Sequence, residues 1–226
     1  MFGKNKIAII VAEFMGTFVL TSAVYAVIIQ RLPALFVASA AGATLGLVVL
    51  TVGSVSGAHL NPAVTLGLWS VRKIQTAKAA VYIAVQFLGA TVACRLNEYF
   101  LGEPLQILAK TGIDWKVFTA EAVGAFVFTF GIASAIYQGY KGLKLATTIG
   151  ASLGLGILVA SITSNGVLNP AVALGIQSWS TAYIAGPLVG ALVGMNLYVL
   201  LFAPTLKPVT LSAKVTTPRP KGQGFW

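Results

Sequence analysis

One short sequence, Leu-Asn-Pro-Ala-Val, occurs twice in this chain, at residues 60–64 and again at 168–172. In each copy the asparagine is a favoured helix N-cap, and the proline suits the first helical position because its missing N–H costs nothing there. A helix of about ten residues from each asparagine is roughly 15 Å long, about half the thickness of a hydrocarbon core. We therefore predict two half-helices, 61–70 and 169–178, that together could cross one membrane.

The rest of the chain is too apolar for a soluble domain. Of its 226 residues, 57% are hydrophobic and only 9% are charged, and the mean hydropathy is +0.88. Six apolar segments each approach the ~20 residues that a spanning helix requires. They are residues 7–29, 35–55, 76–97, 117–138, 145–163 and 181–203. The sequence therefore predicts an all-α, multi-pass integral membrane protein.

The net charge of +10 does not indicate a nucleic-acid partner, because the basic residues are scattered between the apolar segments. If both termini are cytoplasmic, the external loops hold only three basic residues, Arg31, Lys110 and Lys116, which agrees with the positive-inside rule. The plasma membrane is the expected location, and an internal membrane is the alternative. Residues 204–226, with three further prolines and four basic residues after Pro204, are predicted to form a disordered cytoplasmic tail.

The two halves of the chain are duplicates. Asn169 follows Asn61 by 108 positions (169 minus 61), and the same offset relates Glu121 to Glu13 and Gly150 to Gly42. We divide the chain into a first repeat, 1–108, and a second repeat, 109–203. Each repeat contributes three spans, an odd number, so the second is inserted upside down relative to the first. The two half-helices then enter from opposite sides, and their N-termini meet near the midplane, where irregular backbone requires a protein interior or a water-filled cavity.

This arrangement predicts the chemistry of a pore. Each half-helix presents the positive end of its dipole, which disfavours cations. If the oxygens of Asn61 and Asn169 cap the helices, their NH₂ groups are free to donate to a passing solute. Carbonyl groups of the preceding loops, 57–60 and 165–168, provide acceptors. Neutral, hydrogen-bonding molecules are the cargo that suits such a passage.

The boxes Asn61-Pro62-Ala63 and Asn169-Pro170-Ala171, with the Ala-Glu-x-x-Gly-x-Phe copies around Glu13 and Glu121, resemble the aquaporin and glycerol facilitator family of major intrinsic proteins. The resemblance extends to about Phe202. It implies a right-handed bundle of six spans with two re-entrant half-helices, a homotetramer with one pore per subunit, and passive conduction. The implied partners are the lipid bilayer and small neutral solutes.

The resemblance also implies roles for three polar residues. Glu13 and Glu121 would brace the loops of the half-helices, with a proton-carrier role as the alternative, since carboxylates inside membranes are often functional. His59 would line the cytoplasmic vestibule, with a gating proton switch as the alternative.

The outer filter departs from the family's pattern. Most members carry an arginine directly after the second box, where this chain has Val172. Spacing from the boxes assigns the other three filter positions to Ala41, Ile157 and Gly166. None of these side chains is aromatic or charged, so we predict a wide, apolar filter that admits solutes of the glycerol, urea and ammonia class and leaves the cation barrier to the helix dipoles.

Two other functions stay open from the residues alone. Inverted repeats with broken helices also occur in ion-coupled or proton-coupled secondary transporters, and a structural membrane protein could keep a closed pore. Enzymatic activity is not expected, because no nucleophile, base and orienting partner occupy credible positions. One cysteine, Cys94, and one histidine, His59, make no Cys/His metal cluster, and no cofactor is expected.

Overall fold

The structure, a computed structural model, describes residues 4–109 and 112–205. In these residues all regular structure is helical, as predicted. Six long helices are apolar enough to cross a membrane, and two short ones follow the asparagines. The helices are α1 (Lys4–Ile28), α2 (Ala34–Ser56), α3 (Pro62–Ser70), α4 (Thr76–Leu101), α5 (Trp115–Tyr137), α6 (Gly142–Ala160), α7 (Pro170–Gly175) and α8 (Thr181–Leu201), followed by a short 3₁₀ turn, Ala203–Thr205.

Local sequence signals set several of the helix ends. Helix α2 ends at Gly57, whose φ of 98° is a left-handed conformation that glycine adopts without a steric penalty. Helix α4 ends in the same way at Gly102, with a φ of 71°. Asp114 caps α5, because its side chain accepts hydrogen bonds from the backbone N–H groups of Lys116 and Val117.

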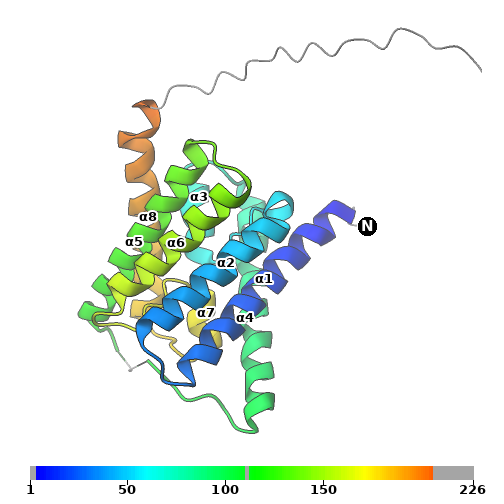
Figure 1. Cartoon of the computed structure of the whole chain (residues 1–226), viewed down its shortest axis with the longest axis vertical. Helices are drawn as coiled ribbons and strands as arrows, with labels where there is room; N and C mark the ends of the chain where they lie inside the picture. The colour runs from blue at the N-terminus through cyan, green and yellow to red at the C-terminus, as the bar shows by residue number, and fades with distance from the viewer. Residues whose placement is uncertain (1–3, 110–111, 206–226) are drawn as a thin grey trace, which may run out of the picture.

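The two repeats pack in the same way, so the duplication is visible in three dimensions. Helix α1 contacts α2 and α4, and its counterpart α5 contacts α6 and α8. Helices α2 and α6 join the halves, and each half-helix reaches across: α3 packs on α8, and α7 packs on α4. Both ends of the described chain lie at the same end of the bundle, and α3 lies nearer to that end than α7 (Figure 1).

The contact between α2 and α6 is made by glycines that are equivalent in the two repeats. A Cβ atom built on Gly42 would lie 2.6 Å from the carbonyl oxygen of Gly150, and a Cβ on Gly150 would collide with the carbonyl oxygen of Gly42. Only hydrogen side chains let the two backbones approach this closely. The halves are therefore joined by backbone contact at this crossing.

The exterior of this fold is apolar, and its largely hydrophobic core contains several polar side chains. Glu13, Gln86 and Thr129 are completely buried, whereas Leu47 and Leu88 on the outside are more than half exposed. An apolar exterior suits a lipid environment.

One predicted helix end differs in the structure, and most of the predicted tail lies outside the described residues. Helix α7 ends at Gly175, three residues before the predicted end at 178, because Gln177 turns into a left-handed conformation with φ 60° and its carbonyl accepts a hydrogen bond from the N–H of Leu108. The predicted disordered tail lies outside the described residues, except for 204–205, which belong to the 3₁₀ turn.

Candidate functional site: a channel between the half-helices

The loop before α3 is held by Glu13 of α1. Its Oε1 accepts hydrogen bonds from the Ser56 hydroxyl at 2.7 Å and from the His59 N–H at 3.0 Å. Its Oε2 accepts from the Leu60 N–H and from the Gln86 side-chain amide, both at 2.9 Å. Four bonds occupy the lone pairs of this fully buried carboxylate.

Glu121 holds the loop before α7 in the same manner. It accepts from the Ser164 hydroxyl at 2.8 Å and from the backbone N–H groups of Val167 at 2.9 Å and Leu168 at 2.6 Å. Glu121 has no counterpart of the Gln86 amide among its donors, because Gly194 stands at the repeat position of Gln86. Neither Glu13 nor Glu121 is among the residues that line the two cavities described below.

The two asparagines cap the half-helices as their sequence context predicts. Asn61 Oδ1 accepts from the Ala63 N–H at 2.8 Å, and Asn169 Oδ1 accepts from the N–H groups of Ala171 at 3.0 Å and Val172 at 3.3 Å. Each cap thus satisfies backbone donors of a helix end that water does not reach freely.

From the sequence we expect the NH₂ groups of these asparagines to be free. In the structure each NH₂ group donates one hydrogen bond to a carbonyl of the other repeat. Asn61 Nδ2 donates to the carbonyl oxygen of Leu168, and Asn169 Nδ2 donates to that of Leu60, both at 2.9 Å. The left-handed conformations of Leu60 (φ 53°) and Leu168 (φ 55°) accompany these contacts. Since each NH₂ carries two hydrogens, one N–H per asparagine is left for a solute.

A narrow cavity passes between the asparagines and the four predicted filter residues. Ala41, Ile157, Gly166 and Val172 all line it, together with Asn61 and Asn169. His59 and the loop residues Asn165 and Val167, which the sequence analysis also placed along the path, line this cavity as well. The lining residues that the sequence analysis did not name are Leu20, Val24, Val37, Leu45, Phe128 and Leu153.

The cavity is apolar, as predicted, but it is not wide in this structure. Its volume is about 20 Å³, which is room for roughly one water molecule. The branched side chains of Ile157 and Val172 line this cavity, and each is 2% exposed.

A larger cavity of about 300 Å³ continues the passage toward the end of the bundle where α1 begins. Leu45, His59 and Phe128 line both cavities, so the two cavities are adjacent. We call the larger one the vestibule. Its remaining lining residues are Val49, Gly53, Gly57, Ala58, Val64, Leu68, Lys73, Ile132, Ile136, Leu145 and Ile149.

His59 lies at the junction of the two cavities. Its Nδ1 is 3.2 Å from the Thr65 hydroxyl oxygen, and that hydroxyl donates to the carbonyl oxygen of Asn61 at 3.0 Å. Since the hydroxyl has one proton, His59 Nδ1 is the donor in the first contact, and Nε2 is left as an acceptor. The ring also packs edge-on against Tyr82 at a centroid distance of 5.0 Å.

The lining follows one face of each pore helix, a signal that the sequence contains. Residues four apart on α2 line the passage from the filter to the vestibule, and the same spacing recurs on α6. The α2 row is Val37, Ala41, Leu45, Val49 and Gly53, and the α6 row is Leu145, Ile149, Leu153 and Ile157. Extending these rows from the filter positions would have located both cavities.

Comparison with known proteins agrees with this geometry. The model of the major intrinsic protein family matches residues 3–198. The chain is 31% identical over 211 residues to the probable aquaporin NIP7-1 of Arabidopsis thaliana, covering 86% of this chain and 76% of that protein. It is 33% identical over 198 residues to the glycerol uptake facilitator protein-like 6 of Lactiplantibacillus plantarum, covering 80% and 92%.

The fold matches a solved structure as well. The aquaglyceroporin from Plasmodium falciparum superposes with a TM-score of 0.71 at 22% identity, covering 88% of this chain and 98% of that chain. The proteins of this family are channels and not enzymes. Two capped half-helices with a cavity between them, together with these likenesses, lead to one conclusion: the chain belongs to the major intrinsic protein family and is a membrane-embedded passive channel for water and small solutes.

Proposed function

We propose that this channel conducts water and small uncharged solutes of the glycerol, urea and ammonia class through an arginine-free filter formed by Ala41, Ile157, Gly166 and Val172. The observation that carries the proposal is that both box asparagines line the narrow cavity and that the vestibule adjoins it at Leu45, His59 and Phe128. A solute on this path passes apolar walls, one N–H from each box asparagine, and loop carbonyls. Such a path favours neutral molecules that can exchange a few hydrogen bonds with water for bonds to the protein.

The deciding experiment is a stopped-flow comparison of water, glycerol, urea and ammonia fluxes in proteoliposomes, with a proton-leak control. We expect water and at least one larger neutral solute to cross faster than through protein-free lipid. Water flux equal to that of bare lipid would favour the structural-protein alternative. Accumulation of a solute against its gradient would favour a coupled transporter.

Ile157→Ala tests whether the filter residues limit solute size. Removing three carbon atoms from a cavity of about 20 Å³ should raise urea and glycerol flux about tenfold, the scale on which one methylene of space discriminates in a tight site. Water flux should change little. Leu155→Ala is the matched control, because Leu155 lies on the same helix but is 54% exposed on the outside. Equal effects of the two substitutions would remove Ile157 from the filter.

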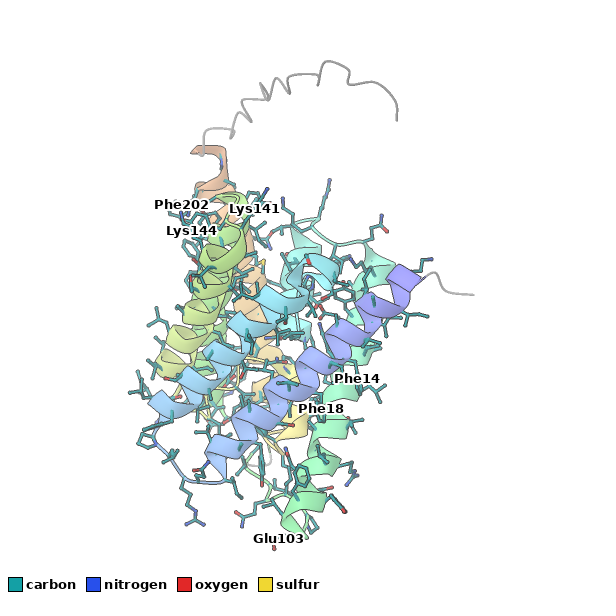
Figure 2. All side chains as sticks on the ribbon, turned by 45° about the vertical axis from the view of Figure 1, so that its right-hand side comes forward. Phe14, Phe18, Glu103, Lys141, Lys144 and Phe202 are labelled. Carbon is teal, nitrogen blue, oxygen red and sulfur yellow. The ribbon has the colours of Figure 1, made fainter. Side chains whose placement is uncertain are left out.

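We also propose that the channel is a homotetramer in the plasma membrane or in an internal membrane. Both termini of each subunit lie on the cytoplasmic side. The tetramer follows from the family resemblance. The topology is supported by the position of both described chain ends at one end of the bundle (Figure 1), which also carries Lys141 and Lys144 (Figure 2), since basic residues favour the cytoplasmic side.

A further inference from the structure

Lys73 lines the vestibule and is not among the residues that line the filter cavity. It follows α3 in the turn 71–75, and its backbone N–H donates to the carbonyl oxygen of Leu68 at 2.8 Å. Its ammonium lies 4.3 Å from the ring centroid of Tyr137 on α5, a distance at which the cation is attracted to the face of the ring. Lys73 therefore reaches from the end of α3 to α5, and it lies at the solvent-exposed mouth of the vestibule, which it lines.

The charge of Lys73 is not cancelled by an ion pair. Among the described residues the one salt bridge joins Arg95 and Glu98 at 2.7 Å. Glu103 lies at the end of the bundle opposite to Lys141 and Lys144 (Figure 2).

The remaining acidic residues do not offset Lys73 at close range. Glu98 is near the end of α4 and Asp114 caps the start of α5, both at the end of the bundle that holds Glu103. Glu13 is fully buried, and its oxygens accept hydrogen bonds from the loop before α3.

A second cation lies near the vestibule. The ammonium of Lys78 is 5.1 Å from the ring centroid of Tyr82, and Tyr82 packs against His59. A cavity lined by charge of one sign, with low-dielectric walls, concentrates the electric field along its axis. The outer filter, by contrast, has no charged side chain.

We propose that Lys73 adds an electrostatic barrier to cations in this channel, at the vestibule and not at the outer filter. This inference rests on the proposed function. A cation that enters the vestibule meets the field of the Lys73 ammonium before it reaches the asparagines, whereas a neutral solute is not repelled. Lys73 is thereby a specificity-determining residue that acts on charge and leaves solute size to Ile157 and Val172.

The chain provides a matched control for this proposal. The ammonium of Lys144 also lies over a tyrosine ring, that of Tyr140, at 3.7 Å from its centroid, and it lies at the same end of the bundle (Figure 2). Lys144 does not line the vestibule. Lys73→Met and Lys144→Met therefore remove the same charge and the same kind of ring contact, but only the first removes it from the solute path.

The test measures potassium conductance in planar bilayers and water flux in proteoliposomes for Lys73→Met, Lys73→Gln, Lys73→Arg and Lys144→Met. Each variant is made both alone and with Ile157→Ala, which lowers the desolvation barrier at the filter so that a cation current is measurable. We expect both neutral substitutions of Lys73 to raise the conductance, normalised to the number of water-conducting channels, about fivefold, since one unit charge about 4 Å from an ion in water contributes about 1 kcal/mol. Lys73→Arg and Lys144→Met should leave it unchanged. The difference should shrink at 1 M salt, where the Debye length falls to about 3 Å.

The possible failures are distinguishable. If water flux is normal but Lys73→Met and Lys144→Met give the same conductance in both backgrounds, the role of Lys73 is overturned and the channel function stands. An increase for Lys73→Arg equal to that for Lys73→Met would also overturn it, because the charge would then not be the cause. If no variant and no parent protein conducts water above bare lipid, the proposed function itself is lost.

Discussion

Glu13→Ala is expected to abolish water flux and to destabilise the folded channel by about 3–5 kcal/mol, the range for breaking a buried hydrogen-bond network. The substitution leaves the backbone N–H groups of His59 and Leu60 and the side chains of Ser56 and Gln86 without their acceptor. No water replaces it easily, because the site is completely buried. The loop before α3 should then lose the conformation that directs the Leu60 carbonyl to Asn169.

Thermal unfolding in detergent and stopped-flow water flux measure the two effects of Glu13→Ala. The control is Glu98→Ala, which removes a carboxylate from an exposed ion pair with Arg95 and should cost less than about 1 kcal/mol. Glu13→Gln should be intermediate, because one oxygen acceptor is kept while the other becomes a donor that faces donors. A Glu13→Ala protein with normal stability and flux would show that the loop holds its shape without the carboxylate.

Val172→Arg is expected to reduce glycerol and urea flux by about tenfold or more, since a long side chain enters a site where one methylene already discriminates between solutes. Val172 is 2% exposed and lines the cavity of about 20 Å³ beside Ile157 and Gly166. The guanidinium adds hydrogen-bond donors and a positive charge at the filter, so cation conductance should fall as well. Proteoliposome fluxes of water, urea and glycerol, with bilayer conductance, measure these changes.

Val172→Met separates size from charge in this experiment. Methionine fills space without adding a charge, so it should reduce glycerol flux and leave cation conductance close to that of the parent protein. Unchanged solute selectivity in Val172→Arg would mean that Val172 does not face the solute path, and it is the result expected of a purely structural protein.

Much of the architecture could be predicted because it is encoded in local, repeated signals. Asn61-Pro62 and Asn169-Pro170 start helices for reasons contained in a few residues, and the structure has both caps. The six apolar segments became α1, α2, α4, α5, α6 and α8 with ends shifted by a few residues. The constant offset of 108 required an inverted pair of three-span units, and equivalent helices do make equivalent contacts.

At the filter, local sequence signals predict which residues line the cavity but not how wide the cavity is. Ala41, Ile157, Gly166 and Val172 could be assigned by spacing, and they lie on one cavity. Their chemistry follows from residue type alone, so the apolar lining was predictable. The width of the cavity was not, because it depends on how side chains from α1, α2, α5 and α6 fill the same space.

The half-helices, the spans, their inverted order and the absence of a charged residue at the filter could be predicted, because each depends on residue type and spacing along one chain. Three other features depend on how the helices pack. Asn61 is bonded to the Leu168 carbonyl and Asn169 to that of Leu60, the filter is narrow, and the ammonium of Lys73 lies over the ring of Tyr137. The first and third of these join residues more than 60 positions apart, and the second depends on side chains from several helices, so no single stretch of sequence contains them.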